Sequence, residues 1–422
     1  MRTRIYNARL LTLESDRGQN GEVWIKDSVI EYIGEKKQTQ EKFHREINAD
    51  GNLIMPGLKN AHTHLAMTFA RSYADDLNLQ AWLNDKIFPM EARLTPIHIY
   101  YYSKLAMMEC ITSGITSVCD MYYEPDAIVQ AAKDTGMRLV LCGAVNNFKE
   151  SPEILEEYYK KFNQEHELIS YVLGFHAEYT TDFAIIKKIG KLAEKYQAPV
   201  FVHNSETEYE VQDCIRRNGV TPTQLFRKAG IYEYGGGGYH CIYLNEDDME
   251  YFRQKGIFAV INTASNLKLA SGIPPVKKLL EHNIKLAMGT DGPSSNNALD
   301  MFREMYLTVV TQKLLEHDAA AFPAFESLKM AARNGADAMQ LKQCDILKQG
   351  KKADLIMIDL KQPNMQPINN LVNNIVYSGG KQNVKMTMIN GEIVYEDGEF
   401  KNIDAEKVYY ETNKFLAEIQ GE

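Results

Sequence analysis

The chain has 422 residues, 45% of them hydrophobic and 24% charged, which is an ordinary composition for a globular protein and excludes a disordered or fibrous one. The formal net charge of −9 argues against nucleic acid or an anionic membrane as the main partner. The start, "MRTRIYNARLLTLESDRG", lacks the apolar run of a signal peptide, and the six scattered cysteines form no C-x-x-C pair, so we expect a reduced, cytoplasmic protein that crosses no membrane.

Short β-rich segments lie at both ends of the chain. Near the start, "GEVWIKDSVIEYIG" predicts two brief strands. Near the end, "ADLIMIDL" predicts a buried strand, and "VKMTMINGEIVYEDGEF" predicts a hairpin that turns at Asn390-Gly391. The simplest packing joins residues 1–54 and 346–422, with a C-terminal helix, into one small composite β-sandwich.

Residues 55–345 alternate short apolar runs with longer helical patterns, which is typical of βα units around a parallel sheet. The runs that qualify as strands are "LIMPGLKNA", "ITSVCDM", "RLVLCGAV", "SYVLGF", "PVFVH", "GGGYHCI", "IFAVIN" and "IKLAMGT". Eight strands with intervening helices, over roughly 240 residues, fit an α/β fold of the (β/α)8 TIM-barrel type.

Polar side chains stand where five of the predicted strands end. They are His62 and His64 after the first strand, His176 after the fourth, His203 after the fifth, His240 after the sixth and Asp291 after the eighth. The C-terminal strand ends of a TIM barrel meet at one mouth, where catalytic groups lie. A single histidine there would most often be a hydrogen-bonded structural residue. Five of the chain's ten histidines in such places indicate a site instead.

The spacing of His62 and His64 puts both side chains on one side of a strand, so they can bind the same ion. Together with His203 and Asp291 they form a set of three nitrogens and one oxygen, which suits one zinc ion with an open position for water. Iron or another divalent ion is an alternative, because the order of affinities does not choose between them. Glu206, three residues after His203, is either a helix-start charge favoured by the dipole or a general acid/base, and both roles are compatible.

Several long segments carry a resemblance to a known family. They are "MPGLKNAHTHLAMTFARSYADDLNLQAWLNDKIFPMEA", "GFHAEYT", "HNSETEYEV", "TASNLKLASGIPPV" and "GTDGPSSNNALDMFREM". On them the chain resembles the amidohydrolase superfamily, specifically its S-adenosylhomocysteine/methylthioadenosine deaminases and chlorohydrolase-like relatives. The resemblance implies a barrel with a composite β-sandwich and one metal ion held by His62, His64, His203 and Asp291. It also implies a mononuclear site, because no lysine stands where binuclear relatives carry a bridging carboxylated lysine.

The resemblance assigns expected roles to the polar residues. Glu206 would protonate a purine ring nitrogen, Asp291 would accept the proton of the attacking water, and His240 would orient that water. His176 would hydrogen-bond the purine, and Glu91, in "FPMEA", would hold the ribose hydroxyls. Glu91 and Trp82, in the loop after the first strand, favour a nucleoside over a free base.

The expected activity is metal-dependent hydrolytic deamination of an adenosine-type nucleoside, with release of ammonia. Methylthioadenosine, 5'-deoxyadenosine and adenosine are the expected substrates. S-adenosylhomocysteine is less favoured, because Gly143 stands where the family carries an arginine near the amino-acid tail, and an arginine placed there is expected to improve its use.

Three points stay open at this level. One is the heterocycle, because guanine, a pterin or a triazine is an alternative substrate. Another is the oligomeric state, because acidic barrels often self-associate. A non-catalytic metal-binding scaffold is disfavoured, because Glu206, His240 and Asp291 are all present.

Overall fold

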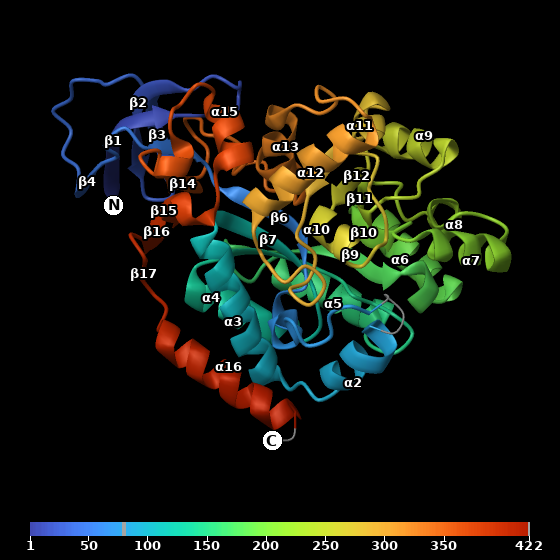
Figure 1. Cartoon of the computed structure of the whole chain (residues 1–422). Helices are drawn as coiled ribbons and strands as arrows, with labels where there is room; N and C mark the ends of the chain where they lie inside the picture. The colour runs from blue at the N-terminus through green and yellow to red at the C-terminus, as the bar shows by residue number, and fades with distance from the viewer. Residues whose placement is uncertain (78–81, 421–422) are drawn as a thin grey trace.

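A computed structural model describes residues 1–77 and 82–420 of the chain (Figure 1). Within those ranges the strands form two sheets, one of eight strands in the order β13-β12-β11-β10-β9-β8-β7-β6 and one of nine strands. The helices that surround the first sheet complete a barrel, and the second sheet lies to one side of it, so the expected fold class is confirmed.

The barrel strands are parallel and almost entirely buried. They are β6 (Leu58–Thr63), β7 (Ile115–Met121), β8 (Arg138–Cys142), β9 (Ile169–Ala177), β10 (Val200–Asn204), β11 (Gly236–His240), β12 (Phe258–Ile261) and β13 (Lys285–Met288). Each overlaps one of the predicted runs. Their mostly apolar residues suit strands covered on both faces.

The barrel closes where the chain leaving β13 meets β6. The backbone N–H groups of Thr290 and Asp291 both donate to the carbonyl oxygen of His62, at 3.1 Å each. This seam fixes the loop after β13 against the end of β6. Two of the predicted site residues, from opposite ends of the barrel sequence, are therefore neighbours.

Helices connect the strands and cover the outside of the barrel. They are α3 (Pro96–Thr112), α4 (Pro125–Thr135), α5 (Pro152–Phe162), α6 (Phe183–Tyr196), α7 (Glu208–Asn218), α8 (Pro222–Lys228), α9 (Glu246–Lys255), α10 (Thr263–Lys268), α11 (Val276–Glu281), α12 (Met301–Leu315), α13 (Ala324–Ala331) and α14 (Arg333–Ala338). Local signals set several boundaries. Ser151, Thr207 and Asn245 cap helix starts, and Gly219 and Gly256 end α7 and α9 in the left-handed conformation.

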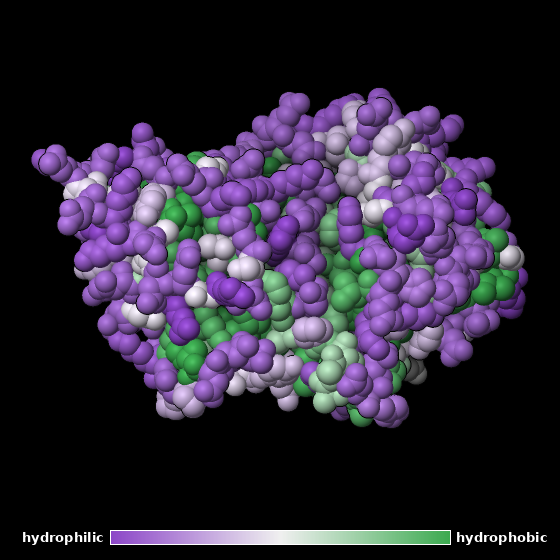
Figure 2. All heavy atoms as spheres, turned by 90° about the horizontal axis from the view of Figure 1, so that it is seen from above, coloured by the Kyte–Doolittle hydropathy of each residue, from purple (hydrophilic) through white to green (hydrophobic). Residues whose placement is uncertain are grey.

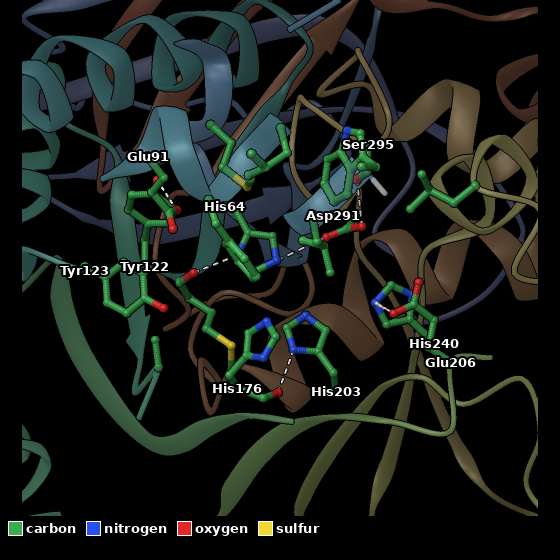
Figure 3. Close-up of a pocket in the computed structure, with 18 of the residues that line it drawn as sticks. His64, Glu91, Tyr122, Tyr123, His176, His203, Glu206, His240, Asp291 and Ser295 are labelled. Carbon is green, nitrogen blue, oxygen red and sulfur yellow. Dashed lines mark hydrogen bonds and ion pairs between the residues drawn. The ribbon is translucent and has the colours of Figure 1, made fainter. Parts of the chain in front are cut away.

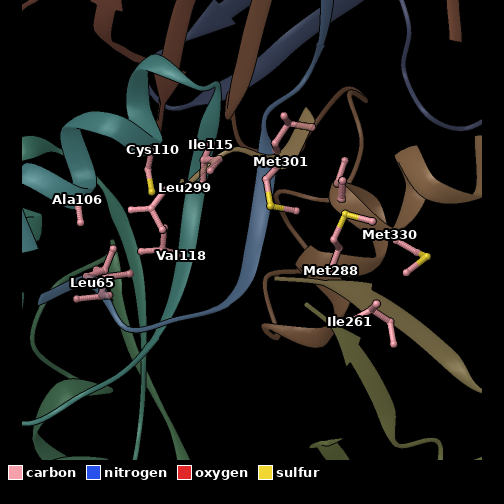
Figure 4. Close-up of a cluster of buried hydrophobic side chains, with 14 of the residues drawn as sticks. Leu65, Ala106, Cys110, Ile115, Val118, Ile261, Met288, Leu299, Met301 and Met330 are labelled. Atoms are coloured by element: carbon pink, nitrogen blue, oxygen red, sulfur yellow. The ribbon is translucent and has the colours of Figure 1, made fainter. Parts of the chain in front are cut away.

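Two hydrophobic layers hold the barrel together. The outer layer lies between strands and helices, as Leu65, Val118 and Cys110 show around α3 and β7 (Figure 4). A smaller cluster fills the inside of the barrel, with Phe201 and Tyr239 among its largest members. This interior packing forms the solid floor on which the polar strand ends stand.

The second sheet joins the two ends of the chain. Its strands are β1 (Arg2–Leu10), β2 (Gln19–Lys26), β3 (Val29–Gly34), β4 (Arg45–Asn48), β5 (Leu53–Pro56), β14 (Leu355–Ile358), β15 (Val384–Ile389), β16 (Glu392–Glu396) and β17 (Glu399–Phe400). The antiparallel pair β5–β14 makes the link between N-terminal and C-terminal segments. At the β15–β16 turn, Asn390 and Gly391 have φ values of 53° and 83°, as a two-residue hairpin turn of this kind requires.

The C-terminal helix α16 (Ala405–Gln420) packs along α3 of the barrel, away from the second sheet (Figure 1). The Tyr102 hydroxyl donates to the carbonyl oxygen of Thr412 at 3.1 Å, and Phe415 is buried in the same contact. In the described ranges, no helix has the length and apolar character needed to span a membrane. Most of the face seen from above is hydrophilic, with apolar side chains showing between purple areas (Figure 2).

Candidate active site

A pocket opens at the C-terminal ends of the barrel strands. The predicted site residues that line it are His64, Trp82, Glu91, His176, His203, Glu206, His240 and Asp291 (Figure 3). His62 lies just beneath, fully buried, with its ring stacked on Tyr239 at 3.6 Å between centroids. The structure thus brings every predicted site residue to one place.

The floor of the pocket is a tight group of ring nitrogens and one carboxylate. The Nε2 atoms of His62 and His203 are 3.2 Å apart. Asp291 Oδ1 lies 3.5 Å from His62 Nε2 and 3.2 Å from His64 Nε2. Ligand-type atoms of His62, His203, His240 and Asp291 all fall within 4.8 Å of one another. Convergence of imidazole nitrogens and a carboxylate is the arrangement that a divalent ion requires.

Backbone contacts orient two of these imidazoles. His64 Nδ1 and His203 Nδ1 each lie 2.7 Å from a carbonyl oxygen, that of Met121 and that of His176 respectively. A ring nitrogen facing a carbonyl must carry the hydrogen, so in the neutral rings both Nε2 atoms present lone pairs to the centre of the group.

Burial sets the charge of the group. It lowers the pKa of His62 to about 3 and the pKa of His203 well below its usual value, so both rings are neutral and able to bind a cation. For Asp291, burial opposes ionisation, but the contacts with the adjacent His62 and His64 rings bring its pKa well below the ordinary range. The carboxylate is therefore charged at neutral pH.

Glu206 and His240 form a second pair beside this floor (Figure 3). His240 Nε2 is 3.7 Å from Glu206 Oε2, and the hydroxyl of Ser271 donates to Glu206 Oε1 at 3.2 Å. Burial raises the pKa of Glu206, which favours its protonated form. A buried carboxyl group with a raised pKa is a suitable general acid.

The contacts of His240 differ from those of His64 and His203. Its Nδ1 faces side-chain amides, with the Asn266 amide nitrogen at 2.7 Å and that of Asn262 at 3.5 Å. With amide N–H groups as donors, Nδ1 is an acceptor and the ring hydrogen sits on Nε2. His240 then serves as a hydrogen-bond donor into the pocket.

Several contributors were not singled out from the sequence. Ser265 and Ser295 both donate to Asp291 Oδ2, at 2.5 and 2.8 Å, and thereby fix the carboxylate. Their signal was available, because both lie within the quoted segments "TASN" and "GPSS". Tyr122, directly after β7, donates from its hydroxyl to Glu91 Oε1 at 2.6 Å. No pattern in the sequence predicts that contact.

The outer part of the pocket is apolar and aromatic. Besides Trp82 and Glu91, it is lined by Met67, Leu83, Ile87, Phe88, Tyr122, Tyr123 and Leu269. Among the described residues, no lysine or arginine lines it. The Lys149 ammonium lies 4.0 Å from the centre of the Tyr123 ring, outside this lining.

Position 143 does not face the substrate side, so that expectation is wrong. A Cβ atom on Gly143 would lie 2.2 Å from Leu155 Cδ1 on α5 and 2.8 Å from the carbonyl oxygen of Gly174. The next residue, Ala144, lines the pocket instead. Because side chains alternate along a strand, an arginine at 143 would be directed against α5 and would not reach a ligand.

Comparisons with known proteins agree with this geometry. The model of the Amidohydrolase family matches residues 53–394. A 5-methylthioadenosine/S-adenosylhomocysteine deaminase of Caldanaerobacter subterraneus subsp. tengcongensis is 39% identical over 419 residues, covering 97% of this chain and 96% of the relative.

Two solved structures are also similar. The adenosine deaminase of Xanthomonas campestris with bound zinc has a TM-score of 0.94 at 28% identity, covering 100% of this chain and 99% of that one. The zinc complex of atrazine chlorohydrolase from Arthrobacter aurescens has a TM-score of 0.91 at 18% identity, covering 98% and 100%, and shows the fold alone. The chain therefore belongs to the amidohydrolase family and is a metal-dependent deaminase of that family.

Proposed function

We propose that this deaminase acts on adenosine-type nucleosides with an uncharged 5' substituent, such as methylthioadenosine, 5'-deoxyadenosine or adenosine, and releases ammonia. One observation carries the proposal. The pocket combines a metal-type floor, a buried acid in Glu206 and a distal carboxylate in Glu91, inside an apolar wall that has no cationic side chain among the described residues.

The metal ligands in this proposal are His62, His64, His203 and Asp291. His64 and His203 direct their Nε2 lone pairs inward because their Nδ1 atoms face carbonyl oxygens. His240 is left out because its Nδ1 faces amide donors, which puts the hydrogen on Nε2. A single divalent ion there, zinc first and iron as the alternative, would lower the pKa of a coordinated water toward about 7.

The protein's own groups move the protons. The Asp291 carboxylate accepts a proton from the attacking water, and Glu206 donates one to the purine nitrogen beside the attacked carbon. His240 donates its Nε2 hydrogen to the oxygen that becomes negatively charged. The amino group then takes the proton held by Asp291, the carbon–nitrogen bond breaks and ammonia leaves. The hydroxyl group on the attacked carbon returns a proton to Glu206, and an oxo-purine nucleoside remains. General acid catalysis of this kind contributes about 10²- to 10⁴-fold.

The remaining residues recognise the nucleoside. Glu91, held by the hydroxyl of Tyr122, is suited to accept hydrogen bonds from the two ribose hydroxyls. Burial lowers the pKa of His176 to about 4, so its ring is neutral and suited to hydrogen-bond the edge of the purine. Trp82 is buried in the wall of the pocket, where its ring can contact the nucleoside.

The lack of a cationic partner disfavours S-adenosylhomocysteine. Its amino-acid tail carries a carboxylate, and the outer pocket offers it Glu91 and aromatic rings but no guanidinium or ammonium group in the described lining. Placing a carboxylate near another without a partner costs several kcal/mol.

A substrate panel tests the proposal. Zinc-loaded protein would be assayed for adenine absorbance loss and ammonia release with methylthioadenosine, 5'-deoxyadenosine, adenosine, S-adenosylhomocysteine, guanine and a pterin. We expect turnover of the three uncharged nucleosides, with kcat/KM for S-adenosylhomocysteine at least about 10-fold lower. Equal use of S-adenosylhomocysteine would refute the charge argument. Turnover of guanine or the pterin alone would show that the substrate is another amino-heterocycle.

A further inference from the structure

Glu210, on the first turn of α7, makes contacts that reach back to the catalytic loop. Its Oε1 accepts a hydrogen bond from the backbone N–H of Ser205 at 3.1 Å, and its Oε2 accepts one from the N–H of Glu206 at 2.7 Å. Glu210 is 5% exposed, so water does not replace these contacts. One buried carboxylate therefore binds two consecutive amides, including the amide of Glu206.

These contacts go beyond ordinary helix capping. Thr207 is the N-cap of α7, and its hydroxyl accepts the N–H of Glu210 at 3.0 Å. In a capping box, the side chain at Glu210 would return to the N–H of the cap residue itself. Here the Glu210 carboxyl group contacts the N–H of Thr207 and also accepts hydrogen bonds from the two residues before the cap. The carboxylate therefore fixes the loop that leaves β10, as well as the helix start.

The same loop is held on its other side by the chain that follows His240. The carbonyl oxygen of Ser205 accepts hydrogen bonds from the N–H groups of Ile242 and Tyr243, at 3.0 Å each. Ser205 also has a φ of 54°, a left-handed conformation that a non-glycine residue keeps only when its surroundings hold it. Glu210 holds the loop through the N–H groups of Ser205 and Glu206. The residues after His240 hold it through the carbonyl oxygen of Ser205.

We propose that Glu210 is a positioning residue that fixes the backbone of residues 205–206 and so holds the Glu206 carboxyl group in register with His240 and the pocket. The inference rests on the proposed function, because Glu210 acts through Glu206. It touches no substrate. Glutamine at this position keeps the volume but turns an amide N–H₂ toward one of the two backbone donors, so one buried N–H loses its acceptor.

A double-mutant cycle separates this role from general destabilisation. The variants are Glu210→Gln, Glu206→Gln and the pair, assayed for kcat/KM on the best nucleoside of the panel. We expect Glu210→Gln to lose about 10²-fold, as misplacement of a reacting group by about 1 Å does. In the Glu206→Gln background the same change should cost less than about 3-fold, because the group it positions is already gone. Additive losses would overturn the inference.

Matched variants control for the chemical change and for folding. Glu208→Gln makes the same carboxyl-to-amide change in the same helix turn, but Glu208 is exposed, so its kcat/KM should stay at the wild-type level. Metal content, measured by elemental analysis, should be unchanged in each. If Glu210→Gln does not fold, Glu210→Asp keeps the carboxyl group but is one methylene too short to bind both amides, and the same non-additivity is expected.

Amide hydrogen exchange tests the contact without any substrate. The peptide containing residues 205 and 206 should exchange faster in Glu210→Gln than in wild type or Glu208→Gln, and unchanged exchange would overturn the inference.

Different results would refute the proposed function and the positioning role of Glu210. Full activity of Glu206→Gln would remove the acid role and with it the proposed mechanism. An inactive Glu206→Gln combined with a fully active Glu210→Gln would remove the positioning role alone.

Discussion

His64 and His240 stand on either side of the metal-type floor, and their Nδ1 partners distinguish their roles. His64 Nδ1 faces the carbonyl oxygen of Met121, whereas His240 Nδ1 faces the amide nitrogen of Asn266. The first contact directs a lone pair into the site and the second directs a hydrogen there. Distance alone would favour His240, which belongs to the group of ligand-type atoms within 4.8 Å. The partners of the two Nδ1 atoms favour His64 as the ligand.

Metal content after single substitutions decides between the two histidines. We expect His64→Ala and His203→Ala to lose at least about 10-fold in metal affinity, because each removes a ligand. His240→Ala should keep its metal yet lose about 10²-fold or more in kcat, because it removes a donor to the developing charge. Elemental analysis after dialysis measures the first effect. A metal-free His240→Ala protein with a metal-loaded His64→Ala protein would reverse the assignment.

Individual residues of the site were predictable from the sequence only where a strand ends on them. His62, His203, His240 and Asp291 each follow or end an apolar run, so their convergence follows from barrel geometry. The supporting contacts were not predictable in this way. Asn266 and Ser265 lie on α10, and their distance from His240 and Asp291 depends on how the loop after β12 folds. The left-handed φ values of His240 (72°) and Asp291 (59°) also had no signal in the sequence.

Among the elements, the strands were predicted well, but the sequence did not show the boundary between β5 and β6. The run "LIMPGLKNA" reads as one segment, whereas the structure divides it into β5 of the second sheet and β6 of the barrel at Gly57. A Cβ at Gly57 would lie 2.1 Å from a Thr116 side-chain atom, so glycine permits the close approach there. Hydrophobic periodicity cannot show that a chain changes sheets within a continuous apolar run, because both halves are buried.

A buried ion pair joins the barrel to the second sheet. Arg138, at the start of β8, donates from two nitrogens to Asp354, which precedes β14, at 2.7 and 2.9 Å. Both side chains are almost fully buried, and Asp354 also accepts the N–H of Asn390 in the β15–β16 turn. Burial would raise the pKa of Asp354, but Arg138 keeps it below its usual value. The pair lies at the N-terminal ends of the strands, away from the pocket.

Asp354→Asn should therefore lower the free energy of unfolding by about 3 kcal/mol or more, because it leaves a buried guanidinium without its counter-charge. Urea unfolding measures the change. Glu396→Gln is the matched control, because its pair with Arg45 also joins distant segments but Arg45 is 41% exposed, and we expect at most about 1 kcal/mol. Equal losses in the two variants would contradict the role assigned to burial. Activity per folded molecule should be unchanged in both.

At the scale of the whole molecule, the barrel and the segment after β6 supply different parts of the site. The ligand-type residues stand on barrel strands or directly after them, over a packed interior. The outer wall comes largely from the segment after β6, including η2 (Trp82–Ile87) and α2 (Phe88–Glu91). The residues proposed for the reaction therefore belong to the barrel strands, and most residues of the outer wall belong to the segment after β6. The fold class followed from the βα alternation, whereas the pocket wall depends on loop conformations that no periodicity encodes.

Metal removal and restoration, followed by ammonia release from methylthioadenosine, tests the central claim most directly. The account predicts that chelator-treated protein loses at least about 10²-fold in turnover, and that one equivalent of zinc restores it. Restoration by one equivalent would match the single group of His62, His64, His203 and Asp291. Ammonia release that is indifferent to metal removal, or none from the zinc-loaded protein, would contradict it.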